Sequence, residues 1–393
     1  MQLFTAEFKA EIEKRLCALQ RNMAELQISA MLINATVNIY YLTGKIFRGY
    51  IYVALNQTPI WFVVKPTIFA ENPDVIFIRK PELIRNVLKE RGYELPRSLG
   101  LELDDLSYSE VVRLQNIFPN AQIANASYVL RLTRMIKTDW EIEQMTEDGK
   151  HHSHVYSKVK DCYKSGMTDL QFQIEIERQL RLEGSLGISR IAGNLMEINL
   201  GSVISGDNAD TPGPYEFTMT GEGVDPSLPV GANNSAIAEG TTVMIDMNGG
   251  FNGYQTDMTR VWALGYIPHS AREAHECSLY ILRELEKLGK PGIPVPELYN
   301  KAIKIVEQWQ LQEYFMGHKN KVNFIGHGVG IELNEMPVIN SRSNIILKEN
   351  MTIALEPKFV IPSVGAVGCE NTYLVTSEGL KNLTVFPEQI ELL

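Results

Sequence analysis

The sequence predicts a two-domain protein, an α/β domain followed by an α+β domain, on two observations. Helical and strand-like segments alternate up to about residue 135, which is typical of an α/β domain with a mostly buried sheet. Beyond that point, pairs of amphipathic helices alternate with two hairpin-like stretches that carry acidic residues. We therefore expect domains at residues 1–135 and 136–393 of the chain.

The first domain opens with apolar residues at helical spacing over residues 6–28. A loop with a partly apolar face is expected over Asn38–Gly44, with helix-like segments at Leu83–Glu90 and Ser109–Ile117. Buried strands are expected at Ala30–Ile33, Tyr50–Leu55, Pro59–Val64, Ser98–Leu101 and around Gln122.

The second domain begins with a helix that Thr138 and Asp139 can cap. Helices are expected over 140–165, 168–183, 271–288 and 296–311, and short strands with a loop over 188–215. His151, His152 and His154 fall on different faces of the first of these helices. We therefore expect them to lie on a solvated surface and not to form a metal site.

Composition and charge exclude several classes of protein. The net charge of −10 argues against nucleic acid or an anionic membrane as a partner. The four cysteines are scattered and form no CxxC pair, which is typical of a reducing compartment. The first residues read as a charged amphipathic helix and not as a signal peptide, and no apolar run has the length of a membrane span. We expect a cytoplasmic protein without a membrane partner.

The stretch Thr242–Trp262 has the pattern of a β-hairpin, since two apolar runs flank a glycine-bearing centre. Each run carries one aspartate, Asp246 and Asp257. With the turn centred between Phe251 and Asn252, the two aspartates lie directly opposite each other, with Cβ atoms about 4.5–5.5 Å apart. Carboxylates that close repel unless a proton or a cation lies between them, and a metal site is the simplest explanation.

A second stretch, Ile353–Val375, repeats this arrangement. Glu356 and Glu370 are equidistant from Ser363 in a turn region, so they too face each other across a hairpin. Between the two stretches, His327 lies in the glycine-rich run F-I-G-H-G-V-G. The candidate metal-ligating residues are therefore Asp246, Asp257, His327, Glu356 and Glu370.

Taken together, these motifs resemble the pita-bread metallopeptidases, which include methionine aminopeptidase, prolidase, aminopeptidase P and the creatinase relatives. The matching features are Asp246, then Asp257 in a D-M-T-R run, then G-H-G-V-G, then E-P and a final glutamate. The early N-I-Y-Y-L-T-G run resembles a creatinase-type N-terminal domain, and R-x-x-R-x-I-K-T-x-x-E from Arg131 resembles its linker. This favours the prolidase and aminopeptidase P branch.

The resemblance implies a creatinase-like α/β domain over 1–135 and an α+β pita-bread catalytic domain over 136–393. Asp246 would chelate one metal ion, His327 and Glu356 would hold the other, and Asp257 and Glu370 would bridge both. A hydroxide that bridges the ions would be the nucleophile, and Glu356 would relay its proton. The oxygen-rich ligand set favours two Mn²⁺ ions, with Co²⁺, Zn²⁺ or Mg²⁺ as alternatives.

The chain departs from the family pattern at four positions. Gly213, Asn323 and Asn334 stand where the resemblance implies three histidines, and Gly368 stands in place of an arginine. The histidines polarise the scissile carbonyl, and loss of one such donor typically costs about 10²–10³ in rate. Tyr215, Phe217 and Met219 follow the altered Pro-Gly run and are candidates to line a changed pocket, with core packing as an equal alternative.

Three functions stay open on the sequence alone. The chain is an Xaa-Pro aminopeptidase or dipeptidase with a rearranged pocket, a hydrolase of another C–N bond like the relatives that act on creatine or ectoine, or a metal-binding homologue without catalysis. The complete ligand set argues against the third function, because unpaired buried carboxylates destabilise a fold. We predict a dinuclear Xaa-Pro peptidase that acts on a small peptide or amide and, as the resemblance implies, forms a homodimer.

Overall fold

The computed structural model describes residues 6–67, 74–193 and 198–393, which divide into two compact units, Met1–Arg134 and Met135–Leu393. The sequence prediction places this division between residues 135 and 136. In the described part of the chain, no helix combines the length and the apolar character needed to cross a membrane.

The first unit is built on a six-stranded mixed sheet in the order β4-β3-β2-β1-β5-β6. β1 pairs antiparallel with β2 and parallel with β5, and apolar side chains of α3 and α4 join the buried core of the strands. Its elements are α1 (Ala6–Glu25), β1 (Ala30–Ile33), α2 (Thr36–Thr43), β2 (Arg48–Ala54), β3 (Ile60–Lys65), β4 (Val75–Phe77), η1 (Pro81–Leu83), α3 (Ile84–Glu90), β5 (Ser98–Leu101), α4 (Tyr108–Ile117), β6 (Gln122–Asn125) and α5 (Ser127–Met135).

The loop expected over residues 38–44 is wrong, because this segment lies in helix α2, which Gly44 ends with a φ of 69°. Asparagine, tyrosine and β-branched residues are poor helix formers, which makes the segment look irregular. Tertiary contacts outweigh that preference, since buried Asn38 donates to Glu102 and accepts from Arg134.

The second unit contains three sheets, with strand orders β17-β9-β8-β7, β11-β10-β12-β15-β16 and β13-β14. Its elements are α6 (Asp139–Tyr156), α7 (Val159–Cys162), α8 (Asp169–Glu183), β7 (Gly201–Ser205), η2 (Gly206–Asp210), β8 (Thr242–Asn248), β9 (Asp257–Ala263), α9 (His269–Leu288), α10 (Val295–Gln308), β10 (Gly326–Gly328), β11 (Glu335–Val338), β12 (Thr352–Leu355), β13 (Lys358–Ile361), β14 (Gly365–Gly368), β15 (Asn371–Thr376), β16 (Gly379–Asn382) and β17 (Glu391–Leu392).

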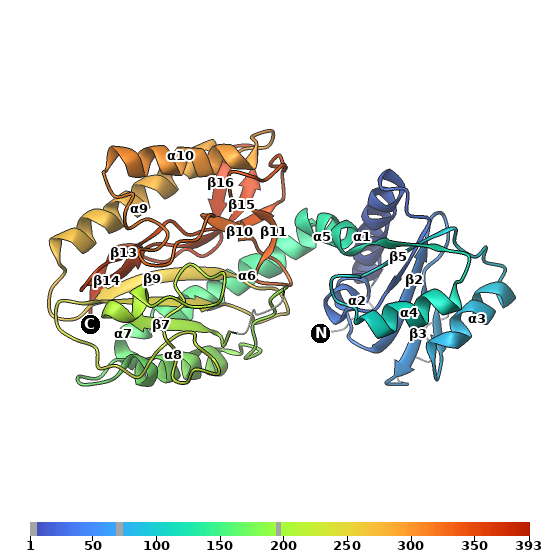
Figure 1. The fold of residues 1–393 in the computed structure, drawn as a ribbon, viewed down its shortest axis with the longest axis horizontal. Helices are drawn as coiled ribbons and strands as arrows, with labels where there is room; N and C mark the ends of the chain where they lie inside the picture. Colours follow the sequence, from blue (N-terminus) through green and yellow to red (C-terminus); the bar gives the residue numbers. More distant parts are fainter. Residues whose placement is uncertain (1–5, 68–73, 194–197) are drawn as a thin grey trace. The chain divides into compact units, whose positions relative to one another are not determined.

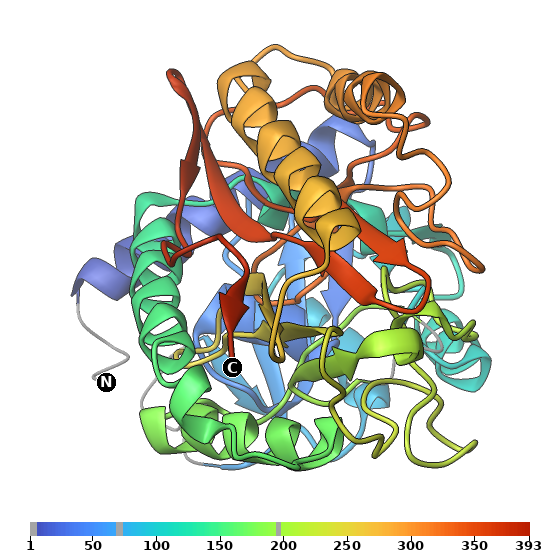
Figure 2. The same ribbon diagram turned by 90° about the vertical axis from the view of Figure 1, so that its left-hand side faces the viewer.

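Helices cover the strands of the second unit from two sides, α6 to α8 on one side and α9 with α10 on the other (Figures 1 and 2). Apolar side chains of α6, α7 and α8 form one buried cluster with β7, β8 and β9. On the other side, α9 lies against β13, β14 and β16. The outer faces of the strands are thus occupied by apolar packing, and charged side chains of the hairpins are left to face the interior between the layers.

Local signals explain how the first helices of this unit begin and where they break. α6 and α8 start with capping boxes, in which Thr138 and Thr168 accept from the third helical residue. The single helix expected over 140–165 is in fact two, α6 and α7. It breaks where the Ser157 hydroxyl donates to the carbonyl of His154, a side-chain bond that competes with helix continuation.

The expectation that all three histidines of α6 are solvated is wrong for His152, which is fully buried. Its Nδ1 lies 3.0 Å from the Thr256 Oγ1, and Thr256 donates to Asp148 at 2.9 Å. Asp148 also accepts from the backbone of Phe251, so this network ties α6 to the loop between β8 and β9. Burial lowers the pKa of His152 to about 3 and raises the pKa of Asp148 to about 7.

Replacement of His152 by glutamine should reduce the loss in the free energy of unfolding that occurs as the pH falls below about 6.5. As pH falls from about 6.5 toward 3, the unfolded chain gains a proton on His152 that the folded chain does not, so the wild type loses stability. The variant lacks this loss, and the free-energy difference between the two proteins should shrink by at most about 1.4 kcal/mol per pH unit. Urea unfolding of both proteins across this range measures it. Parallel profiles would contradict a buried neutral histidine, and the difference should stay constant above about pH 7.

Candidate active site

The first hairpin has a different register from the expected one. Asp246 pairs with Thr259 and Asp257 pairs with Asn248, so the aspartates do not lie directly opposite each other. The turn is centred one residue later than expected, which shifts the register by two. A shift of two keeps both carboxylates on one face of the sheet as diagonal neighbours.

The second hairpin has the register that the sequence predicts. Leu355 pairs with Asn371, and Lys358 pairs with Gly368. Glu356 and Glu370 belong to the same register between these two pairs, so they lie across from each other. His327 comes from β10, which pairs with β12 on one side and β11 on the other.

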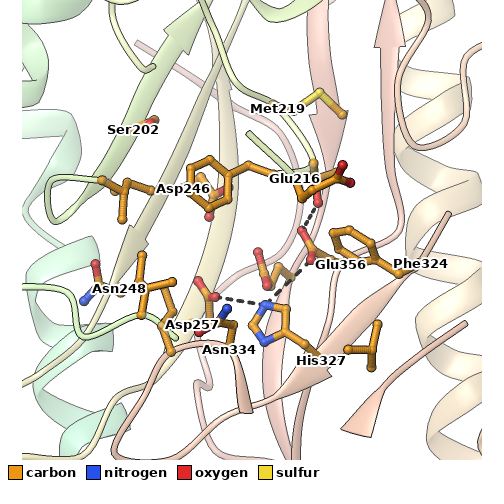
Figure 3. Close-up of a pocket in the computed structure, with 18 residues that line it drawn as sticks. Ser202, Glu216, Met219, Asp246, Asn248, Asp257, Phe324, His327, Asn334 and Glu356 are labelled. Atoms are coloured by element: carbon orange, nitrogen blue, oxygen red, sulfur yellow. Dashed lines mark hydrogen bonds and ion pairs between the residues drawn. The ribbon is translucent and has the colours of Figure 1, made fainter. Parts of the chain in front are cut away.

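The five candidate ligands meet at one cavity of about 300 Å³ in the second unit. His327 Nε2 lies 3.6 Å from Asp257 Oδ2 and 3.8 Å from Glu356 Oε1 (Figure 3). Ligand atoms of Asp257, His327 and Glu370 all lie within 4.8 Å of one another. These atoms form one group that fits a divalent ion.

The electrostatics of this group also favour a bound cation. Burial raises the pKa of Asp257 well above its usual range, and the Glu370 carboxylate adds to this effect. Burial likewise raises the pKa of Glu370 to about 8, although Lys358 opposes the shift. Among the described residues, none donates a hydrogen bond to the buried Glu370 Oε1. An orphaned buried carboxylate oxygen beside an imidazole is what a hard divalent ion would satisfy.

The sequence analysis missed Lys358, whose side chain is 0% exposed. Its Nζ lies 2.9 Å from Asp246 Oδ2 and 2.8 Å from both Glu356 Oε2 and Glu370 Oε2. Burial opposes its charge, but Asp246, Glu356 and Glu370 outweigh burial and keep the pKa of Lys358 well above its usual value. A signal was present in the sequence, because Lys358 follows Glu356 by two residues and a strand places such residues on one face.

The two halves of the predicted two-ion site therefore differ in the structure. Asp257, His327 and Glu370 offer donors for one ion, whereas Lys358 lies where Asp246 would hold the other. The second Asp246 oxygen, Oδ1, lies 2.8 Å from the Thr259 hydroxyl, whose single proton is shared between this oxygen and Glu370 Oε2 at 2.7 Å. The residues around Asp246 do not fit a further ion in this arrangement.

Of the predicted pocket residues, Asn334 lines the cavity. Its side-chain oxygen accepts from the backbone N–H of Ala192 at 2.8 Å, and its side-chain nitrogen donates to the Ala192 carbonyl at 2.9 Å. Gly213, Tyr215, Asn323 and Gly368 are not among the described residues that line the cavity.

The environments of these four residues differ. Asn323 is exposed, while Tyr215 is buried and stacks on Phe217 with ring centroids 5.5 Å apart. A Cβ at Gly213 would meet Thr220 at 2.8 Å. His318, in the loop before Asn323, bonds Asp210 at 2.9 Å and is likewise not among the described lining residues.

Phe217 and Met219, which follow the altered Pro-Gly run together with Tyr215, do line the cavity. Sequence reasoning missed other residues of the cavity wall, among them Phe324 with its aromatic ring and Glu216 with its carboxylate (Figure 3). Thr218 lines it too, and its hydroxyl donates to Glu356 Oε2. Only long-range folding brings these side chains to the site, so no local motif marks them.

Comparisons with known proteins agree with this architecture. The Creatinase/Prolidase N-terminal domain model matches residues 15–136, and the model of Metallopeptidase family M24 matches residues 143–377. The Xaa-Pro dipeptidase of Pyrococcus furiosus is 26% identical over 379 residues, 95% of this chain and 98% of that protein. The putative dipeptidase YkvY of Bacillus subtilis is 25% identical, over 93% of this chain and 96% of its own length.

Solved structures show the same fold. The prolidase from Pyrococcus horikoshii OT3 superposes with a TM-score of 0.77 at 24% identity, covering 95% of this chain and 99% of that one. The Xaa-Pro dipeptidase from Bacillus anthracis superposes with a TM-score of 0.80 at 22% identity, covering 97% and 100%. The resemblance inferred from the motifs is confirmed: the chain is a metal-dependent hydrolase of Metallopeptidase family M24, with a creatinase-like domain ahead of its pita-bread domain.

Proposed function

We propose that the chain cleaves the bond before proline in short peptides, as an Xaa-Pro dipeptidase or aminopeptidase. The observation that carries this proposal is the group of Asp257, His327 and Glu370, with its unpartnered Glu370 oxygen, at a cavity with aromatic walls. The names of the relatives supply the proline preference. Phe217 and Phe324 offer apolar surface that suits a pyrrolidine ring.

The proposed roles follow from the positions of the side chains. A divalent ion held by Asp257, His327 and Glu370 would supply Lewis acidity and a more acidic water. Glu356 presents Oε1 toward His327, while its Oε2 accepts from Lys358 and Thr218. The free side of Glu356 is thus placed to hold a proton and to transfer it to the leaving proline nitrogen.

We propose Mn²⁺ as the ion, because carboxylate and imidazole donors suit it, with Co²⁺, Zn²⁺ and Mg²⁺ as alternatives. We also propose a cytoplasmic protein without nucleic-acid or membrane partners, in line with the net charge of −10. The proposed homodimer is supported by the family resemblance alone.

A second candidate substrate is a non-peptide amide. This candidate is favoured by Asn334, because the backbone of Ala192 engages its oxygen and one of its two N–H donors and fixes the orientation of the other. A smaller or cyclic amide places fewer demands on such donors.

Addition of Mn²⁺ to chelator-treated protein should raise its thermal midpoint. An ion that binds only the folded chain stabilises it by about 2.7 kcal/mol at a concentration 100 times its Kd. His327→Ala should abolish this response. His318→Ala is the matched control, because His318 also lies beside a carboxylate but is not among the described lining residues. Differential scanning calorimetry measures the shift, and a response that survives in His327→Ala would contradict the assignment.

The Mn²⁺-loaded protein should release proline from Xaa-Pro dipeptides or cleave Xaa-Pro tripeptides. Asp257→Asn should lower the rate by at least about 10²-fold, because it removes a charged ligand from the reacting centre. Asp225→Asn, on an exposed turn, is the matched control and should keep full activity.

Chromatographic detection of the products measures both peptide reactions. If the wild type leaves every proline peptide intact but hydrolyses a small amide in the same assay, the second candidate replaces the first.

A further inference from the structure

We propose that the Lys358 ammonium permanently takes the place of one of the two metal ions that the family resemblance implies, so that each chain binds a single divalent ion. The inference rests on the ion-binding group of the proposed function, but it does not depend on the substrate. It is carried by the contacts of Lys358 with the carboxylates.

The hydrogen bonds of Lys358 are complete. A lysine ammonium has three N–H donors and no acceptor. Three carboxylate oxygens, one each from Asp246, Glu356 and Glu370, lie 2.8 to 2.9 Å from its Nζ. Every donor is therefore matched by a carboxylate oxygen, which satisfies the hydrogen-bonding requirement of a fully buried ammonium.

An ion near Asp246 would need the same oxygens. Asp246 Oδ2, Glu356 Oε2 and Glu370 Oε2 already contact the ammonium, and Asp246 Oδ1 lies 2.8 Å from the Thr259 hydroxyl. A divalent ion bound to these oxygens would lie within a few ångströms of Nζ, where two like charges repel strongly in a buried site. The ammonium and an ion at this position exclude each other.

The backbone holds Lys358 firmly in this position. Lys358 is the first residue of β13 and pairs with Gly368, and its carbonyl accepts from the backbone of Met316 at 2.9 Å. A Cβ at Gly368 would meet the Pro357 oxygen at 2.7 Å and Lys358 Cα at 2.8 Å, and the φ of Gly368 is +141°. Glycine at this position leaves room for the strand that carries the lysine.

The two glutamates divide their oxygens between the ammonium and the other half of the site. Glu370 Oε2 faces Lys358, whereas Oε1 has no partner among the described residues. Glu356 Oε2 also faces Lys358, whereas Oε1 lies 3.8 Å from His327 Nε2. Glu370, which the resemblance assigns as a bridge between two ions, thus has one oxygen on the ammonium and one oxygen available to hold an ion.

A metal count on the full chain tests this inference. The protein is stripped with a chelator, loaded with Mn²⁺, desalted and analysed by elemental mass spectrometry, and titration calorimetry gives the stoichiometry independently. We expect one ion per wild-type chain. Two ions per wild-type chain would overturn the inference, and so would none.

The Lys358→Ala variant provides a second test in the same metal count, because the substitution frees three carboxylate oxygens for a further ion. We expect its stoichiometry to rise from one to two, and an unchanged count would overturn the inference. Lys137→Ala is the matched control and should keep one ion. Lys137 is also a buried lysine, 1% exposed, and bonds Glu335 at 2.9 Å outside the residues that line the cavity.

If Lys358→Ala does not fold, electron paramagnetic resonance of the Mn²⁺-loaded wild type decides the question. An isolated ion supports the inference, and an exchange-coupled pair overturns it. None of these readouts uses a substrate. A chain that binds one ion but does not cleave proline peptides supports the inference and contradicts the proposed function. A chain that binds two ions and cleaves proline peptides contradicts the inference and supports the proposed function.

Discussion

The catalytic unit depends on balancing the charge of a carboxylate cluster in its interior. The cluster comprises Asp246, Asp257, Glu356 and Glu370. Burial raises the pKa of Asp257 and of Glu370, and repulsion from the neighbouring carboxylates adds to both shifts. Apolar packing cannot remove this repulsion, so the fold must supply cations. Lys358 supplies one from within the chain, and the group around His327 is arranged to take another from solution.

The layers of the second unit hold the cluster together. Apolar contacts of α6, α7 and α8 occupy the outer side of β7 to β9, and α9 lies against β13 and β14. Thr259 then joins the two hairpins, because its hydroxyl contacts Asp246 at 2.8 Å and Glu370 at 2.7 Å. Its backbone also forms a β-bridge with Glu370. The hydroxyl thus connects carboxylates that are more than a hundred residues apart in sequence.

The sequence predicts the parts of the site that depend on local symmetry. The second hairpin has the expected register because its turn is short and its glutamates are placed evenly about Ser363. The first hairpin is displaced because contacts with α6 hold its loop, where Asn252 donates to the Gln144 carbonyl and Asp148 accepts from Phe251. Such long-range hydrogen bonds produce no periodic pattern in the sequence. For the same reason, the burial of His152 is not predicted.

The alternation of side chains along a strand predicts that Lys358 lies on the same face as Glu356. It does not predict the contact with Asp246, which is 112 residues away in the sequence. Its three donors are all engaged, so Lys358 has none left to offer a substrate. It acts as a positioning residue: it contacts Oε2 of each glutamate and leaves Oε1 of each out of contact with the ammonium. With one fixed cation in the site, Lewis acidity must come from the single remaining ion position. The orientation of a substrate carbonyl then depends on that position and on the walls formed by Phe217 and Phe324.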